Sequence, residues 1–186
     1  MDTALAQSLH GLWGKVPMLD AAFALSASFL PYVLVTAFVA MFWGVSGGSE
    51  GSAFARRTRR LYAALGVAIA IIVAFGVIIP AIRLGYAPER PFAAFGWKPL
   101  IAMSPDAPSF PSGHATLLFL VATAMWQGNR NRGYWLFAGA ALVSFARVYA
   151  GVHFPIDILC GALLGILSML LARKALPPLH GSVYHS

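Results

Sequence analysis

The stretch LYAALGVAIAIIVAFGVIIPAI at residues 61–82 contains no charged residue, and it decides which kind of fold this chain can form. A helix needs about 20 predominantly apolar residues to cross the hydrocarbon core of a bilayer. A second uncharged stretch covers residues 21–49. Both stretches are long enough to cross, so the sequence predicts an all-α integral membrane protein.

The composition of the whole chain agrees with a membrane protein. Of the 186 residues, 59% are hydrophobic and 10% are charged, whereas soluble domains carry about 25% charged residues. The net charge of +7 would favour a nucleic-acid partner for a soluble protein. In a membrane protein arginines instead set the topology, so we expect membrane lipids as partners and no nucleic acid. The length suits a single domain over residues 1–186.

Three shorter apolar runs follow, and each becomes long enough to span only when it includes a polar residue at one end. Those polar residues are His114, Arg147 and Asp157. We therefore expect a compact bundle of about five transmembrane helices, near residues 21–46, 61–83, 112–128, 133–150 and 155–173. Residues 1–20 carry apolar side chains at helical spacing, which predicts an amphipathic helix lying at the membrane interface.

Two details of these spans concern packing. Pro31 lies inside the first span and predicts a kink, because proline removes a backbone hydrogen-bond donor. Gly161 and Gly165 form a GxxxG pattern in the fifth span. That pattern fits either a dimer face or close packing inside the bundle, so the sequence leaves oligomerisation open.

Basic residues predict the orientation of the chain. Eight of them fall on one side of the five spans: Arg56, Arg57, Arg59, Arg60, Arg130, Arg132, Arg173 and Lys174. By the positive-inside rule that side is cytoplasmic, and the amino terminus is outside. His114, Arg147 and Asp157 then all interrupt their helices at the outer end. Ionisable groups within spans are costly and usually functional, so this convergence predicts a site at the outer face.

Three segments bring chemically active residues to this end. RLGYAPERP supplies Arg83 and Arg90, PSGH covers residues 111–114, and ARVYAGVHFPID supplies Arg147, His153 and Asp157. Arginine is always charged and can pair with two phosphate oxygens at once. Three arginines beside two histidines and one aspartate therefore fit a tetrahedral oxyanion such as a phosphate group.

Two helix starts complete the predicted site. Ser112 is expected to cap the third span, and the free N–H groups of Gly113 and His114 then point outward, where an anion can bind. Asp157, in the first turn of the fifth span, can accept a hydrogen bond from His153. The far nitrogen of His153 is then free to attack phosphorus, while the second histidine serves as general acid.

A metal site is the main chemical alternative. The candidate ligands would be His114, His153, Asp157, Glu89 and Asp106. The arginines already supply the positive charge that a metal ion would bring, and they would repel one. No close-spaced ligand motif such as HExxH is present in the sequence. We therefore expect no catalytic metal and no other cofactor.

The three segments resemble the three motifs of the type 2 phosphatidic acid phosphatase superfamily, in both spacing and order. Longer stretches, such as RVYAGVHFPIDILCGALLG, are similar to the bacitracin-resistance branch of undecaprenyl-diphosphate phosphatases. The resemblance implies His153 as the nucleophile that forms a phosphohistidine, Asp157 as its orienting carboxylate and His114 as the general acid. It also implies phosphate-binding roles, without a metal, for Arg83, Arg90, Ser112, Gly113 and Arg147.

Two positions depart from the family pattern. Arg83 stands where the family usually has lysine, so the charge is kept but a point donor becomes a planar fork. Ala146 stands where the family usually has serine, so one hydrogen bond to phosphate is lost or a neighbour such as Ser144 replaces it. Glu89, next to Arg90, either compensates charge or contacts the substrate.

The resemblance implies hydrolysis of undecaprenyl diphosphate to undecaprenyl phosphate at the outer face of a bacterial inner membrane, so that the lipid carrier of cell-wall synthesis can be reused. A phosphatase for phosphatidylglycerol phosphate, phosphatidate or lipid A phosphate would use the same site. The non-enzyme alternatives are a transporter that binds anionic lipid and a structural lipid scaffold. Five short spans without paired half-structures are few for a transporter.

Overall fold

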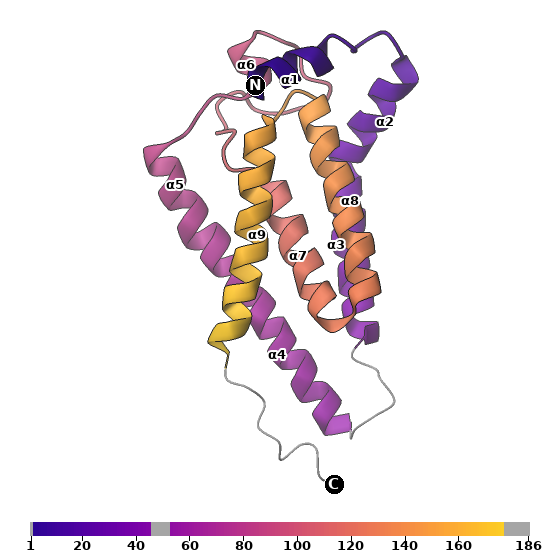
Figure 1. Ribbon diagram of the computed structural model, residues 1–186, viewed down its shortest axis with the longest axis vertical. Helices are drawn as coiled ribbons and strands as arrows, with labels where there is room; N and C mark the ends of the chain where they lie inside the picture. The colour runs from indigo at the N-terminus through magenta and orange to yellow at the C-terminus, as the bar shows by residue number, and fades with distance from the viewer. Residues whose placement is uncertain (1, 46–52, 177–186) are drawn as a thin grey trace.

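The computed structural model describes residues 2–45 and 53–176, and every regular element in these two ranges is a helix. The elements are α1 (Asp2–His10), α2 (Pro17–Ser28), α3 (Leu30–Val45), α4 (Ala53–Ile71), the π-helix η1 (Ile72–Ile78), α5 (Ile79–Gly85), α6 (Pro91–Ala94), α7 (Gly113–Gly128), α8 (Arg130–Tyr149) and α9 (Pro155–Ala175). Figure 1 shows the long helices as a bundle, with α1 and α6 lying across one end of it.

Among the described residues, two helical segments are long and apolar enough to cross a membrane on their own, Arg57–Gly85 with 29 residues and Pro155–Ala175 with 21. The α2–α3 pair makes a third when its two bent halves are counted as one span. α7 has only 16 residues, and α8 includes three arginines. α7 lies between α8 and α9 and packs against both (Figure 1). The expected total of five spans stays a prediction.

The span expected near residues 61–83 is the middle of a longer helical segment. α4, η1 and α5 follow one another without a break. Arg57, Arg59 and Arg60, which we expected in a connecting loop, lie in the first half of α4. Arginine has a high helix propensity, so nothing in this stretch ends the helix before the apolar residues begin. Arg83 stands at the far end of the segment, in the last turn of α5.

The amino-terminal segment differs from the single helix expected over residues 1–20. α1 ends at His10, a turn follows, and α2 begins at Pro17. Gly14 in the turn has a φ of 75°, a value that glycine adopts readily and that interrupts a helix. Proline suits the first turn of the next helix. α1 lies across the end of the bundle, where Leu9 packs against buried side chains of α7, α8 and α9.

The first expected span is bent. The axes of α2 and α3 differ by 45°, and the break falls at Phe29, between the two helices. Pro31 follows two residues later and has no N–H with which to continue the hydrogen bonding of α2 into α3. The structure therefore shows the kink that the sequence predicts, and its physical cause.

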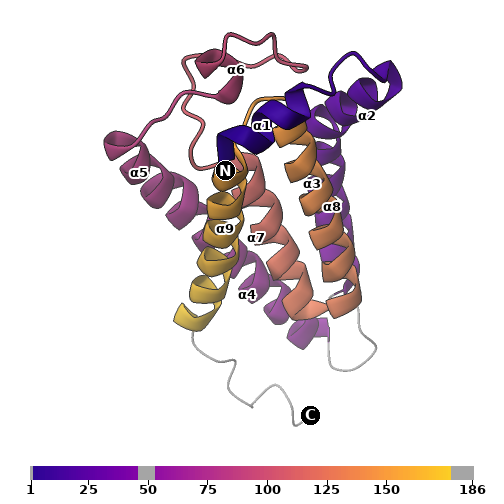
Figure 2. The same cartoon turned by 45° about the horizontal axis from the view of Figure 1, so that its top comes forward.

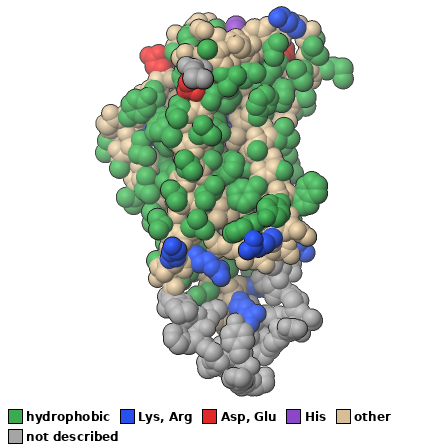
Figure 3. All heavy atoms as spheres, viewed as in Figure 1, with side chains coloured by type: hydrophobic (Ala, Val, Ile, Leu, Met, Phe, Trp, Pro, Cys, Tyr) green, Lys and Arg blue, Asp and Glu red, His purple; other side chains and the backbone are tan. Residues whose placement is uncertain are grey.

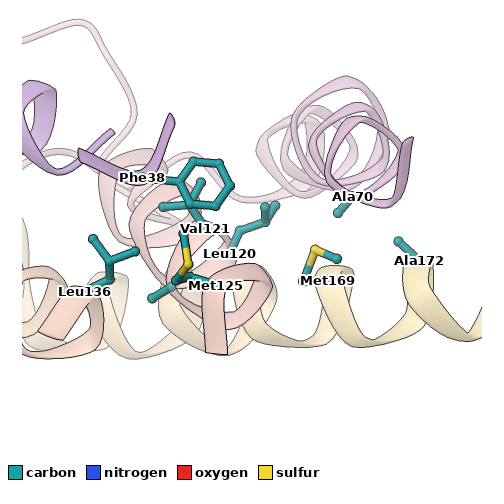
Figure 4. Packing of buried hydrophobic residues seen from close by; sticks show 9 residues of the cluster. Phe38, Ala70, Leu120, Val121, Met125, Leu136, Met169 and Ala172 are labelled. Carbon is teal, nitrogen blue, oxygen red and sulfur yellow. The ribbon is translucent and has the colours of Figure 1, made fainter. Parts of the chain in front are cut away.

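The centre of the bundle is α7, which packs against α3, α4, α8 and α9. Figure 4 shows the largest cluster of buried side chains, which these five helices share: Phe38, Ala70, Leu120, Val121, Ala122, Met125, Leu136, Met169 and Ala172. Because α7 is surrounded by partners, its first residues are held in a fixed position at the end of the bundle.

The GxxxG pattern of α9 faces α7. A Cβ atom added at Gly161 would lie 2.6 Å from the carbonyl oxygen of Ser112. A Cβ atom added at Gly165 would lie 2.2 Å from the carbonyl oxygen of Thr116. Both distances are far below van der Waals contact, so these glycines allow the two helix backbones to approach closely. Of the two interpretations that the sequence leaves open, the structure shows packing inside the bundle.

On the face that Figure 3 shows, the bundle is apolar over most of its height, and Lys and Arg side chains gather toward its lower end. α9 ends there with Arg173 and Lys174, and α8 begins there with Arg130. The opposite end carries α1, α6 and the loops around them, and Figure 2 turns this end toward the reader.

Candidate active site

The three segments singled out in the sequence meet at the end of the bundle that α1 and α6 cover (Figure 2). Nε and Nη2 of Arg83 donate to the carbonyl oxygens of Phe110 and Pro111, at 3.2 and 3.3 Å, and so tie α5 to the loop before α7. The backbone N–H of Ser112 donates to the carbonyl oxygen of Asp157 at 3.0 Å and ties the start of α7 to the start of α9. The chain thus brings its three predicted segments into direct contact.

Arg90 is held rigidly by backbone groups. It is 6% exposed and donates to the carbonyl oxygens of Ala107, Pro108 and Val152, at 2.9, 3.1 and 2.8 Å. Its Nη1 also lies 3.3 Å from Nε2 of His153. A guanidinium group can only donate, so this contact is favourable when Nε2 carries a lone pair and no proton. Arg90 therefore favours the tautomer in which Nε2 of His153 can act as a nucleophile.

His153 and Asp157 form a buried pair at the start of α9, and they are 2% and 1% exposed. Nδ1 of His153 lies 3.5 Å from Oδ2 of Asp157, which is within ion-pair distance but longer than a typical N–H···O hydrogen bond. The same Oδ2 accepts hydrogen bonds from the hydroxyl of Ser109 and, at 2.7 Å, from the N–H of Phe154. Two donors therefore fix this carboxylate oxygen beside the imidazole.

The surroundings of His153 favour its neutral form. Burial lowers the pKa of His153 to about 4, the charges of Arg147 and Arg90 act in the same direction, and Asp157 opposes them. A neutral imidazole keeps the lone pair that a nucleophilic nitrogen needs. The charge state of His153 therefore agrees with the tautomer that Arg90 favours.

The start of α7 has the geometry expected for an anion site. Oγ of Ser112 accepts a hydrogen bond from the N–H of Ala115 at 3.5 Å and so caps the helix. Gly113 and His114 follow it and are half-buried. Backbone N–H groups in a first helical turn have no partner within the helix, so they are free to bind an anion. His114 also lies within electrostatic range of His153 and of two site arginines.

Arg147 enters the site from the last turn of α8 and is 2% exposed. Its Nη1 donates to the carbonyl oxygen of Ala27 at 3.2 Å. Its Nε is buried and has no hydrogen-bond partner among the described residues. Buried polar groups in native proteins are nearly always hydrogen-bonded. This Nε is therefore a donor that is available to an anionic ligand.

The loop that carries His153 is also held by the amino-terminal segment, a connection that was not predicted from the sequence. Nε1 of Trp13 donates to the carbonyl oxygen of Tyr149 at 2.8 Å. The hydroxyl of Tyr149 donates to Oδ1 of Asp20 at 2.7 Å. The sequence signal for this contact was Asp20, a carboxylate at the start of an apolar stretch, where charged groups seldom lack a role.

Ser109 is a second residue whose role was not predicted from the sequence. It is fully buried, its N–H donates to the carbonyl oxygen of Pro88 at 2.9 Å, and its hydroxyl donates to Asp157. It therefore links the segments that carry Arg90, Ser112 and Asp157. Serine is common in loops, so its place beside the PSGH motif alone did not indicate this contact.

The remaining candidates lie apart from these contacts. Glu89 is exposed, and within residues 2–45 and 53–176 it forms no ion pair with Arg90. Ala146 is buried, and the buried hydroxyl of Ser144 has no hydrogen-bond partner in the part of the chain that is described. In that same part, no group of three or more His, Cys, Asp or Glu residues is arranged to hold a metal ion.

Comparisons with known proteins place this arrangement in a family. A model of the PAP2 superfamily matches residues 61–179, which include all three segments. The undecaprenyl-diphosphatase BcrC of Bacillus subtilis is 28% identical over 169 residues, which cover 90% of this chain and 80% of BcrC.

Two solved structures resemble the whole bundle. The structure of LpxE from Aquifex aeolicus has a TM-score of 0.65 and 25% identity, and the match covers 93% of this chain and 94% of LpxE. A transmembrane PAP2-type phosphatidylglycerolphosphate phosphatase from Bacillus subtilis has a TM-score of 0.64 and 22% identity, with 96% and 87% of the two chains covered. The all-α membrane fold and the family resemblance predicted from the sequence are thereby confirmed, while the roles of the individual site residues stay predictions. The chain is a membrane lipid phosphatase, and it belongs to the PAP2 superfamily.

Proposed function

We propose that this protein hydrolyses undecaprenyl diphosphate to undecaprenyl phosphate and inorganic phosphate. The observation that carries the proposal is the contact between Nη1 of Arg90 and Nε2 of His153 at 3.3 Å, inside a cluster with Arg83, Arg147 and His114. A phosphoryl group at this point would meet a nucleophile and several positive charges at once. The similarity to BcrC supports undecaprenyl diphosphate as the substrate.

The proposed chemistry has two steps. In the first, Nε2 of His153 attacks the terminal phosphorus, the P–O bond to undecaprenyl phosphate breaks, and His114 donates a proton to the departing oxygen. In the second, His114 accepts a proton from water, the water oxygen attacks phosphorus, and the P–N bond breaks to release phosphate. Asp157 holds the imidazole through Nδ1, and the arginines neutralise the charge that builds up on the phosphoryl oxygens.

We also propose that the site faces the outside of a bacterial inner membrane. The support is the separation of charge along the bundle: Arg130, Arg173 and Lys174 stand at the end opposite to the site. Basic residues are enriched on the cytoplasmic side of membrane proteins. A carrier lipid whose diphosphate is released outside would then reach the site from the outer leaflet.

The decisive experiment is phosphate release by the purified full-length protein from undecaprenyl diphosphate in the presence of EDTA. We expect multiple turnovers without added metal, inhibition by orthovanadate, and no turnover by the H153A variant. A labelled terminal phosphate should give an acid-labile adduct on the wild-type protein. Full turnover by H153A would refute the mechanism, and loss of activity in EDTA that magnesium restores would refute metal-independent chemistry.

The choice of substrate needs a separate comparison. Undecaprenyl diphosphate, phosphatidylglycerol phosphate, phosphatidate and a lipid A phosphate should be tested side by side at equal mole fraction in detergent. We expect the highest kcat/KM for undecaprenyl diphosphate. A higher kcat/KM for any of the other three would show that the substrate is wrong while leaving the phosphatase chemistry intact. Binding of these lipids without phosphate release would instead favour a transporter or scaffold.

A further inference from the structure

The hydrogen bond between Arg147 and Ala27 joins two residues that are far apart in the sequence and both buried. Nη1 of Arg147 lies 3.2 Å from the carbonyl oxygen of Ala27. Ala27 is 0% exposed and Arg147 is 2% exposed. Ala27 lies in the last turn of α2, directly before the 45° bend into α3. A residue of the candidate site is therefore anchored on the backbone of a different membrane helix.

The sequence explains why this carbonyl oxygen is available. In a continuous α-helix the carbonyl of residue 27 would accept a hydrogen bond from the N–H of residue 31. Residue 31 is a proline and has no N–H. Pro31 is itself buried, so water is not at hand to replace the missing donor. The proline thus leaves one buried acceptor unpaired within its own helix, and Arg147 supplies the donor.

The bond also determines how the guanidinium group of Arg147 is oriented. The group is planar and rigid, so fixing Nη1 on a backbone atom restricts the directions of its other N–H bonds. Nε remains buried and unpaired among the described residues. Arg147 lies within electrostatic range of Arg90, so its free donors belong to the same positive cluster. One donor nitrogen of the guanidinium group, Nη1, is anchored on the backbone, and the remaining donors are available to a phosphoryl oxygen.

We propose that Pro31 is a positioning residue for the phosphate site: by leaving the carbonyl oxygen of Ala27 without its helical donor, it provides the anchor that orients Arg147. This inference rests on the proposed phosphatase activity, in which Arg147 binds the transferred phosphoryl group. It assigns a role in catalysis to a kink that otherwise serves only to bend the first span.

The test is the substitution Pro31→Ala, which restores an N–H opposite the carbonyl oxygen of Ala27. The new N–H competes with Arg147 for this acceptor. We expect kcat/KM for undecaprenyl diphosphate to fall about tenfold and the orthovanadate concentration for half-inhibition to rise about tenfold, as for the loss of one hydrogen bond to a charged group. We expect the thermal unfolding temperature in detergent to stay the same or to rise, because alanine favours a helix and proline disfavours it.

The matched control is Pro80→Ala. Pro80 also lies in an apolar helical segment, but it is exposed, whereas Pro31 is buried. This variant should keep the kcat/KM and the vanadate sensitivity of the wild type. Pro31→Gly serves as a second test variant, since it restores the same N–H without the side chain of alanine.

Combining Pro31→Ala with Arg147→Lys distinguishes the positioning of Arg147 from a general effect of the helix bend. Lysine lacks the planar fork of donors through which one arginine side chain can bond both the carbonyl oxygen of Ala27 and the phosphate. In the Arg147→Lys background, Pro31→Ala should therefore cause no further loss of kcat/KM. A further tenfold loss there would overturn the inference, and so would wild-type kinetics of both Pro31 variants or a drop in their unfolding temperature parallel to the loss of activity. Failure of the proposed function itself would be visible separately, as absence of turnover by the wild-type protein.

Discussion

The hydroxyl of Ser109 donates a hydrogen bond to Oδ2 of Asp157, the same oxygen that lies 3.5 Å from Nδ1 of His153. The serine is fully buried, so no water molecule competes for this oxygen from its side. Ser109 therefore fixes the position of this carboxylate oxygen beside the imidazole.

Replacing Ser109 by alanine should lower kcat without a comparable change in KM. The loss of one hydrogen bond to a charged group corresponds to about 1.5–3 kcal/mol, so we expect a decrease of about 10- to 100-fold. Ser109→Thr should retain more activity than Ser109→Ala because it keeps the hydroxyl. Ser104→Ala, at an exposed serine of the same loop, is the matched control and should behave as the wild type. Equal kcat values for Ser109→Ala and the control would contradict the role assigned to Ser109.

The pH dependence of kcat/KM should show an acid limb set by His153. Its pKa is lowered to about 4 by burial. Above that pH the imidazole is neutral and can attack phosphorus; below it, the imidazolium has no lone pair, so kcat/KM should fall tenfold per pH unit. Asp157 opposes the shift, so removing its charge in Asp157→Asn should move the acid limb to lower pH. An acid limb that stays in place, or moves to higher pH, in Asp157→Asn would show that another group controls it.

His114 can be tested through the leaving group. If it donates the proton to the departing oxygen, its loss should matter least where that oxygen needs no proton. General acid catalysis typically contributes about 100- to 10,000-fold, so we expect a decrease of that size for His114→Ala with undecaprenyl diphosphate. The decrease should be much smaller with p-nitrophenyl phosphate, whose leaving group is a weak base. His153→Ala should lose both activities. Equal losses of activity with the two substrates in His114→Ala would argue against proton donation by His114.

The close approach of α7 and α9 makes a prediction about stability. A Cβ atom at Gly165 would lie 2.2 Å from the carbonyl oxygen of Thr116, so Gly165→Ala must push the two helices apart. Overpacking of this kind typically costs about 1–3 kcal/mol. We expect a lower unfolding temperature in detergent. Gly76→Ala is the control, because the nearest heavy atom to an added Cβ there lies 3.9 Å away. It should be neutral or stabilising, and similar effects of both variants would contradict the packing described for α9.

Much of the fold could be predicted because the bilayer imposes strong constraints on the sequence. Long uncharged runs had to form helices, and Pro31 had to disturb one of them. The limits of α1 could not be predicted in the same way, because apolar spacing continues past His10. The backbone changes to turn hydrogen bonds directly after His10, and Gly14 then adopts a positive φ. The glycines of α9 could form a dimer face or pack inside the bundle. Their spacing alone does not show which helix they face, so this choice required the position of α7.

The candidate site could be predicted where sequence spacing brings two side chains together. It was less predictable where side chains are held by hydrogen bonds to the backbone. His153 and Asp157 are four residues apart at a helix start, so their proximity follows from local geometry. The partners of Arg90 and Arg147 are mostly carbonyl oxygens. Every residue has such an oxygen, so no residue type in the sequence marks the ones that matter. The same reason hid the contact of Trp13 with Tyr149.

The two faces of α9 differ in how freely their residues can be substituted. Along one face, Gly161 and Gly165 meet the backbone of α7 and leave no room for a larger residue. Along the other face stand four half- to largely exposed leucines, Leu159, Leu163, Leu167 and Leu171. Substitutions in this outward row can adapt the protein to bilayers of different thickness or lipid composition without moving the start of α9. The lipid-facing row can therefore change with the membrane, while the start of α9, which carries Asp157, keeps its position beside the PSGH segment.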